Sequence, residues 1–492
     1  MKLILRVCIM GVLCASFQGA SIAQVTIGTD SPPLPGTLLQ LKGSGTYSGN
    51  ANADKGLMLP RVKLEQLDDL APLVTGASQT DKTAHTGMLV YNINQATCPG
   101  VYIWNGSEWV SMQKRSTEII KTNDAESNTF ILPPGATIEF PITKAYTVWH
   151  SAEYGDILGN VTLSTNPDDL RVLFLWEDAE TLIESVELVK NTTDATKSVI
   201  RVKANGDYCG GGNASVAILI GGSTVRWSWH IWVTDYNPNT ASATSYGANT
   251  ATKGSVYKYN DGMFDHVFMD RNLGAKNAIP GDAGTIGMYY QWGRKDPIPT
   301  YKDWNKSFYT LREIDGSVIS PIGMLQTSGN QPLSKVIRLP DMFYGAGEAA
   351  WTSDFTSRLW TPQTEAKSYF DPCPKGWRVP AVEHGTGTSP WDGLYYNSDT
   401  DTNLPWSAAG KGRESAAVGY YPAAGEGASS LSAGIEHVGS FWTASSEKWM
   451  WGGTSTMAYA FEFQDNSYGQ AYVAPLALRN SAFALPVRCE KE

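Results

Sequence analysis

Two cysteine-containing segments in the last quarter of the chain constrain its fold most. The first is the run 371–380, which contains Cys373, and the second is Val487-Arg488-Cys489. A disulfide between Cys373 and Cys489 would close a loop of about 115 residues, and cross-linking a long loop removes the most entropy from the unfolded chain. Because the sequence between them is rich in Trp, Tyr and Gly, we expect a stapled, loop-rich recognition domain.

The first residues have the layout of a secretory signal. Lys2 and Arg6 provide the positive start, an apolar run follows, and Ser21-Ile22-Ala23 is a small-x-small cleavage site. The apolar run is too short to span a bilayer. We therefore expect a signal peptide over residues 1–23, cleaved after Ala23, and a protein that is exported to the cell surface or secreted.

Charge and cysteine content narrow the partners and the compartment. The net charge of −10 argues against nucleic acid as a partner, because phosphate binding needs a basic face. No later segment is apolar enough for a membrane-spanning helix. Four cysteines follow residue 23, and an even number in an oxidising compartment favours disulfides. Cys98 and Cys209 fall in different predicted domains, so the sequence leaves open whether they pair or are buried thiols.

Residues 24–115 are predicted to form a β-rich N-terminal module. Two alternating apolar strands flank Asn105-Gly106, which is a strong signal for a β-hairpin. The layout of this block resembles the N-terminal modules of Bacteroidetes surface proteins, which are related to phage tail-fibre sequences. The resemblance implies a homo-oligomer that forms through this module.

Residues 116–237 are predicted to form a β-sandwich, because short β-rich runs recur between Gly, Pro and Asn turns. Within the last run, Trp227, Trp229 and Trp232 nearly alternate. They are interpreted as a strand face packed in a core, with an exposed aromatic platform as the alternative. Residues 238–253 are rich in Ser, Thr, Asn and Ala and are predicted to be a linker.

Five segments of residues 254–492 resemble the Fibrobacter succinogenes major paralogous domain, a C-type-lectin-like module of bacterial surface proteins. They are residues 268–275, 287–297, 371–383, 440–446 and 486–489. The resemblance implies an α+β C-type-lectin-like domain in which Cys373 and Cys489 are the structural disulfide. The predicted fold class is therefore mainly β and multidomain, with a β-rich N-terminal module, a β-sandwich and this C-terminal domain.

Two stretches carry aromatic and small polar residues beyond what the predicted fold needs, namely 384–412 and 447–453. Such loops on a rigid scaffold suit ligand contact, because Trp and Tyr faces stack on ligands and Asp or Asn adds directional hydrogen bonds. The alternative is that these aromatic residues pin long loops to the body. The predicted ligand-binding residues are Trp391, Asp392, Tyr395, Tyr396, Trp406, Trp449 and Trp451.

The motifs of common catalytic and metal sites are missing from the sequence. The six histidines contain no closely spaced pair, whereas a zinc site usually shows two ligands at short spacing. No nucleophile elbow, phosphate loop or dinucleotide fingerprint is present. The Glu-Pro-Asn or Gln-Pro-Asp tripeptide of calcium-dependent lectins is also missing. We therefore expect no catalytic residues, no metal and no cofactor. The alternative is a pair of converging carboxylates, as in a glycosidase.

These observations lead to one main hypothesis and two alternatives. The main hypothesis is a non-enzymatic adhesion protein whose C-terminal domain contacts a glycan or a surface protein. The first alternative is a structural subunit of a fimbria or other surface assembly, at its tip. The second is a glycan-active enzyme.

Overall fold

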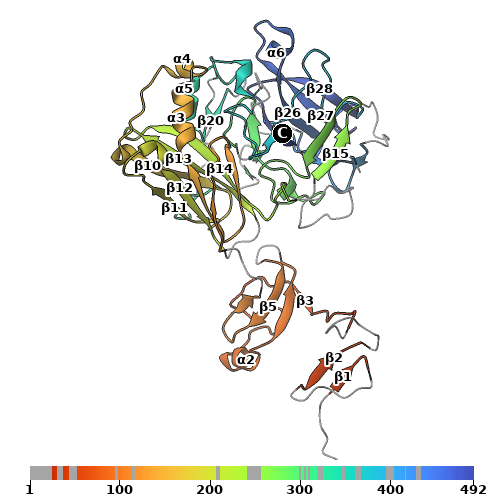
Figure 1. Cartoon of the computed structure of the whole chain (residues 1–492). Helices are drawn as coiled ribbons and strands as arrows, with labels where there is room; N and C mark the ends of the chain where they lie inside the picture. Colours follow the sequence, from red (N-terminus) through yellow and green to blue (C-terminus); the bar gives the residue numbers. More distant parts are fainter. Residues whose placement is uncertain are drawn as a thin grey trace, which may run out of the picture. The chain divides into compact units, whose positions relative to one another are not determined.

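The computed structural model describes residues 25–29, 37–43, 53–94, 98–112, 117–206, 211–240, 256–298, 301–303, 306–307, 311–319, 325–326, 329–345, 350–360, 367–394, 404–415, 417–427 and 434–492. The protein is mainly β, with several separate sheets and short helices (Figure 1), which confirms the predicted fold class. The chain divides into two compact units. The N-terminal unit comprises residues up to 63 with 68–92 and 101–110, and the C-terminal unit comprises 64–67, 93–100 and 111–492.

The N-terminal unit contains two small sheets. In one, β1 and β2 pair in parallel, and in the other the strand order is β3-β4-β5-β6. The elements are β1 (Val25–Ile27), β2 (Leu39–Leu41), β3 (Arg61–Val62), α2 (Gln79–Ala84), β4 (Leu89–Asn92), β5 (Gly100–Trp104) and β6 (Trp109–Ser111). The hairpin predicted at Asn105-Gly106 joins β5 to β6, and Gly106 has a φ of 105°, which favours glycine. The Asn105 side chain closes the turn by accepting from the backbone N–H of Glu108 at 2.8 Å.

Two tryptophans fill the small core of this unit. The rings of Trp104 and Trp109 meet edge to face with centroids 5.4 Å apart. Each indole N–H donates to a backbone carbonyl, that of Lys82 at 2.7 Å and that of Asp69 at 2.9 Å. Because a buried indole N–H needs such an acceptor, the two tryptophans fix the loop before α2 and the end of α2 against the sheet.

Two four-stranded sheets, with strands between Ile119 and Val233, lie within the range 116–237 for which a β-sandwich was predicted. One sheet has the strand order β10-β13-β14-β8 and the other β11-β12-β9-β7. The strands are β7 (Ile119–Lys121), β8 (Thr129–Leu132), β9 (Thr137–Pro141), β10 (Leu170–Glu177), β11 (Ile183–Val189), β12 (Val199–Ala204), β13 (Gly212–Ile220) and β14 (Val225–Val233), and helices α3 (Thr143–Trp149) and α4 (Gly155–Leu158) follow β9. Phe130 of one sheet stacks on Phe140 of the other at 4.2 Å, and Phe140 also contacts Trp229 at 5.4 Å.

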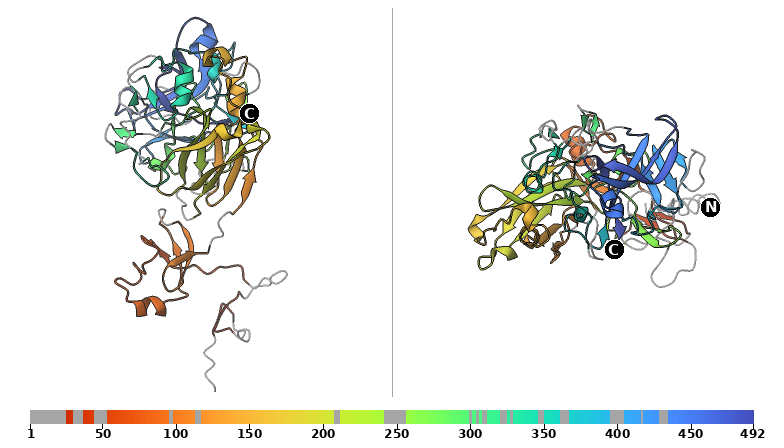
Figure 2. Two further views of the ribbon diagram at one scale, coloured as in Figure 1. Left: turned by 90° about the vertical axis from the view of Figure 1, so that its left-hand side faces the viewer. Right: turned by 90° about the horizontal axis from the view of Figure 1, so that it is seen from above.

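Strand β14 is buried on both faces. Trp227, Trp229 and Trp232 are all buried, in agreement with the core interpretation. His230 and Trp232 point away from the sandwich interior: His230 is hydrogen-bonded to Asn213, and the Trp232 indole donates to the carbonyl of Ala275 at 3.1 Å. The sandwich and the C-terminal region thus share one apolar core and lie side by side in both views (Figures 1 and 2).

The C-terminal region is an assembly of small sheets around one longer antiparallel sheet, β26-β27-β28. Its longer strands are β15 (Val256–Asn260), β16 (Asp265–Met269), β26 (Val438–Ser446), β27 (Met457–Gln464) and β28 (Tyr472–Asn480), and its helices are α5 (Leu333–Arg338) and α6 (Glu447–Trp451). The short strands are β17 (Tyr289–Gln291), β18 (Tyr301–Asp303), β19 (Lys306–Ser307), β20 (Leu325–Gln326), β21 (Phe343–Tyr344), β22 (Trp377–Arg378), β23 (Trp406–Ser407), β24 (Gly412–Ser415), β25 (Gly419–Pro422), β29 (Ala484–Pro486) and β30 (Glu490–Lys491).

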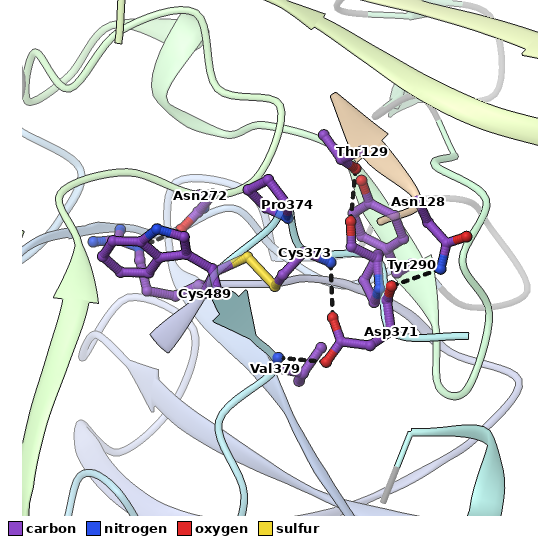
Figure 3. The surroundings of a disulfide bond; sticks show 12 residues. Asn128, Thr129, Asn272, Tyr290, Asp371, Cys373, Pro374, Val379 and Cys489 are labelled. Carbon is purple, nitrogen blue, oxygen red and sulfur yellow. Dashed lines mark hydrogen bonds between the residues drawn. A yellow bond between two sulfur atoms is a disulfide. The ribbon is translucent and has the colours of Figure 1, made fainter. Parts of the chain in front are cut away.

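Cys373 and Cys489 are joined by a disulfide with a Cα–Cα distance of 6.0 Å (Figure 3). The bond lies beside the pairing of β22 with β30. Asp371 organises this segment, because its carboxylate accepts from the backbone N–H groups of Cys373 and Val379, both at 2.8 Å. The sandwich also holds the segment: the Asn128 amide donates to the Asp371 carbonyl at 2.7 Å. Cys98 is likewise disulfide-bonded, so it is not a buried thiol, while Cys209 lies outside the described residues.

His266 ties the hairpin β15–β16 to the end of the chain. Its ring nitrogens lie 2.6 Å from Oε1 of Glu490 and 3.1 Å from Oδ2 of Asp261. Burial opposes a charge on the imidazole, but the hydrogen bonds and charges of Glu490 and Asp261 outweigh it and raise the pKa of His266 above its usual value. The folded protein therefore holds the imidazole proton of His266 more tightly than the unfolded chain does.

Removal of the disulfide by Cys373→Ala with Cys489→Ala is expected to lower the free energy of unfolding by about 2–5 kcal/mol, because the unfolded chain regains the entropy of a long loop. Denaturant unfolding followed by tryptophan fluorescence measures the change. An unchanged midpoint would show that the pairing of β22 with β30 holds this region without the covalent bond.

The raised pKa of His266 predicts a pH-dependent contribution to stability. The folded state holds the proton more tightly than the unfolded chain, so the stabilisation is complete below the unfolded pKa of about 6.5 and is lost as the pH rises through the folded pKa. The difference in unfolding free energy between the wild type and His266→Gln should therefore be larger at about pH 5.5 than at about pH 8.5. A difference that stays constant between these pH values would contradict the raised pKa of His266 in the folded protein.

Candidate functional site

The N-terminal unit carries an unusual amount of exposed apolar surface. Eleven of the 24 large apolar side chains that are exposed in the described residues lie in this unit. The most exposed is Met58, at 86%, and its neighbour Leu57 is 68% exposed. Single exposed apolar residues are ordinary, but such a concentration marks a surface that another molecule covers.

One part of this surface is the parallel pair β1–β2. Val25 lies opposite Leu39 and Ile27 lies opposite Leu41 in the register. Since side chains alternate along a strand, these four side chains share one face of the pair. All four are exposed, so this face is apolar and uncovered in the single chain.

A second part is a groove beside the sheet β3-β4-β5-β6. Its volume is about 600 Å³, and it is lined by Gly56, Leu57, Met58, Leu59, Arg61, Tyr91 and Val101. Arg61 is the charged residue in this lining. The groove is therefore suited to apolar side chains rather than to a charged ligand.

The comparison with known families agrees with this location. Residues 26–128 match the family described as "Phage tail like trimerisation region". The match confirms the predicted relation of the N-terminal region to phage tail sequences, and it indicates a homo-oligomer. No curated protein matches the chain. The family match does not extend into residues 254–492, so the resemblance drawn there stays a prediction.

The C-terminal loops differ sharply in how they present their aromatic residues. Trp391 is fully buried. Its ring lies between those of Phe268 and Phe461, with centroids at 5.4 and 5.0 Å, and its indole donates to the Tyr421 hydroxyl at 2.9 Å. The ligand role predicted for Trp391 is therefore corrected to a core role, because all of its faces are occupied by other side chains.

The other ligand-binding residues predicted between 384 and 412 differ in how exposed they are. Trp406 is half-buried in β23, edge to face with Phe463 at 6.3 Å and beside the Arg413 guanidinium at 5.8 Å. Asp392 is partly exposed, and burial followed by the charge of Asp261 raises the pKa of its carboxyl. Tyr395 and Tyr396 lie outside the described residues. This stretch thus anchors its loop with one tryptophan and leaves a second partly accessible.

Helix α6 presents the clearest aromatic surface of the predicted set. Trp451 is 72% exposed, and its indole donates to the Tyr459 hydroxyl at 2.7 Å. Met450, in contrast, packs into a small core with Val382 and Leu478. Trp449 lies in the same helix, but its side chain is outside the described part of the structure. The ring of Trp451 is thus held at the surface by a helix that is itself anchored.

Two exposed apolar residues of the C-terminal unit were not predicted from the sequence. Met263 and Phe264, in the turn between β15 and β16, are 55% and 43% exposed. The Met263 sulfur accepts from the Thr388 hydroxyl at 3.3 Å, which places this turn against the loop that precedes Trp391. No apolar periodicity marks these two residues, because they lie in a turn after Asp261-Gly262.

One pair of carboxylates, buried Glu462 and partly buried Glu426, bears on the enzyme hypothesis. Glu426 and Glu462 both bond to the Arg479 guanidinium, and the distance from Nε to Glu426 is 3.2 Å. Glu462 also accepts from the hydroxyls of Ser440 and Tyr472. The single positive charge of Arg479 compensates part of the negative charge of both carboxylates, which is the pattern of a structural ion cluster.

Among the described residues, no three His, Cys, Asp or Glu side chains are grouped so that they could hold a metal ion. In the same part of the chain, no helix has the length and apolar character needed to cross a bilayer.

The contrast between Trp391 and Trp451 gives a stability prediction. Trp391→Ala should lower the free energy of unfolding by about 3–5 kcal/mol, because it opens a cavity between two aromatic rings. Trp451→Ala should cost about 1 kcal/mol or less, since only an exposed ring and one hydrogen bond are lost. Thermal and denaturant unfolding of both variants measures the difference. Equal losses would contradict the placement of these two side chains.

Proposed function

We propose that the chain is a structural subunit of an exported, non-enzymatic trimeric assembly of the surface or tail type. The N-terminal unit would hold three copies together, and the C-terminal unit would be displayed by them. The observation that carries the proposal is that exposed apolar surface concentrates in the residues that match a trimerisation region.

Physical reasoning supports the same conclusion. A two-stranded sheet is at best marginal in water, and parallel sheets occur almost only where both faces are covered. The pair β1–β2 is such a parallel sheet, with an uncovered apolar face. Burial of an apolar side chain stabilises by about 1.5–3 kcal/mol. A trimer repeats this gain at every interface, so the exposed side chains of this unit favour assembly.

The subunit mass of the chain without residues 1–23, measured by native mass spectrometry, tests the proposal. We expect three copies per particle. Met58→Glu should weaken the assembly by about tenfold or more, because it places a charge in an apolar contact. The matched control is Leu173→Glu, which alters a side chain of β10 that is 40% exposed outside the matched region, and it should leave the trimer intact. A wild-type protein that is only monomeric would overturn the proposal.

A finer role is proposed for the displayed unit, namely contact with a glycan or a surface protein through Trp451. An exposed indole on an anchored helix can stack on a sugar ring or pack against an apolar side chain. Three copies would add avidity, because binding of one copy raises the local concentration of the others.

Glycan arrays and immobilised host-matrix proteins are the probes for this role. If the wild type binds one of them, Trp451→Ala should reduce the binding while Trp451→Phe, which keeps an aromatic face, should retain most of it. The folded Leu173→Glu variant serves as the control for surface changes elsewhere. Binding that survives Trp451→Ala unchanged would remove this residue from the contact.

A further inference from the structure

The strands β1 and β2 form a parallel pair whose apolar face is exposed in the single chain. The backbone N–H of Val25 donates to the Leu38 carbonyl at 2.8 Å, and that of Lys42 donates to the Ile27 carbonyl at 3.1 Å. Gly28 permits this close approach, because a Cβ at this position would lie 2.3 Å from the Lys42 carbonyl oxygen. Among the described residues, no third strand pairs with β1 or β2. The pair is thus specified locally but lacks the cover that a parallel sheet needs.

The groove at Leu57 and Met58 is a hollow that could accept the apolar face of β1–β2. Its lining is mainly apolar, and its volume of about 600 Å³ is not filled by the residues that line it. The face formed by Val25, Ile27, Leu39 and Leu41 is apolar and carries no charge. Each surface would therefore lose its contact with water if the two were packed together.

The length of chain between the two surfaces permits an exchange between copies. Residues 42–55 connect β2 to the groove, and a connection of this length spans up to about 50 Å when it is extended. In a threefold assembly, a contact between two different surfaces closes into a ring when each copy donates to the next. Such a ring covers every β1–β2 face and every groove, and it leaves neither exposed at an end.

We infer that β1–β2 of each copy packs its apolar face into the groove at Leu57 and Met58 of the neighbouring copy. The occupant of the groove is therefore a second copy of this chain. The inference rests on the proposed trimer and adds to it the two surfaces that meet. Residues 42–55 would then be the covalent connection between the exchanged pair and the rest of its own chain.

Disulfide trapping tests this arrangement in the chain without residues 1–23. Both Ile27→Cys and Met58→Cys are introduced into one chain, the protein is oxidised, and it is run on a non-reducing denaturing gel. If the arms are exchanged, each new bond joins two chains, and covalent dimers and trimers appear. The matched control combines Ile27→Cys with Leu173→Cys, which should give no covalent trimer. Both substituted positions are exposed, so the variants should fold.

The possible results separate the inference from the trimer itself. A native trimer that yields only covalently monomeric chains would overturn the exchange, because the groove would then be filled by its own chain or by another surface. A native monomer would overturn both the exchange and the proposed assembly. A covalent trimer from the test pair, but not from the control pair, is the result that we expect.

Discussion

Strand β14 is the element on which the larger unit depends, because it belongs to two cores at once. Trp229 packs into the sandwich, while His230 and Trp232 face the C-terminal region. Burial lowers the pKa of His230 to about 3, so this ring is neutral and acts as a fixed hydrogen-bonding group. Lys295 is buried beside β14, where it bonds to the Ser228 carbonyl at 3.1 Å and to Asp296. His230 and Lys295 both have hydrogen-bond partners, which is the condition for keeping polar groups in an interior.

The two units differ in how far they bury their large apolar side chains. The C-terminal unit buries most of its large side chains, and even the aromatic residues of its loops are partly taken into cores. The N-terminal unit has a small core around Trp104 and Trp109 and leaves Leu57, Met58 and the face of β1–β2 exposed. A surface of this kind is incomplete in a single chain, because the hydrophobic effect favours its removal from water. The proposed trimer would account for this difference, because other copies of the chain would cover the exposed apolar surface of the N-terminal unit.

Local sequence signals predicted local structure well. Asn105-Gly106 specified its hairpin, the recurring β-rich runs specified the sandwich strands, and the three tryptophans of β14 are in a core as interpreted. The candidate ligand residues were harder, because Trp391 and Trp451 occur in similar glycine-rich surroundings. Their tertiary contacts separate them. Trp391 stacks on Phe268, which is far away in the sequence, whereas the Trp451 indole donates to the hydroxyl of Tyr459 in the adjacent strand and its ring is exposed. Periodicity cannot report such long-range partners. The core that the sandwich shares with the C-terminal region could not be predicted from the sequence for the same reason.

The disulfide also has a mechanical consequence. Trp451 lies inside the covalent loop that Cys373 and Cys489 close. Tension applied at Trp451 and resisted at the N-terminal side of the chain must pass through this loop. Two arms then share the load, and the shorter arm, from Trp451 to Cys489, limits how far the polypeptide can be drawn out. In a protein that holds a partner against fluid flow, this disulfide would limit the extension of the chain under load, independently of the free energy of unfolding.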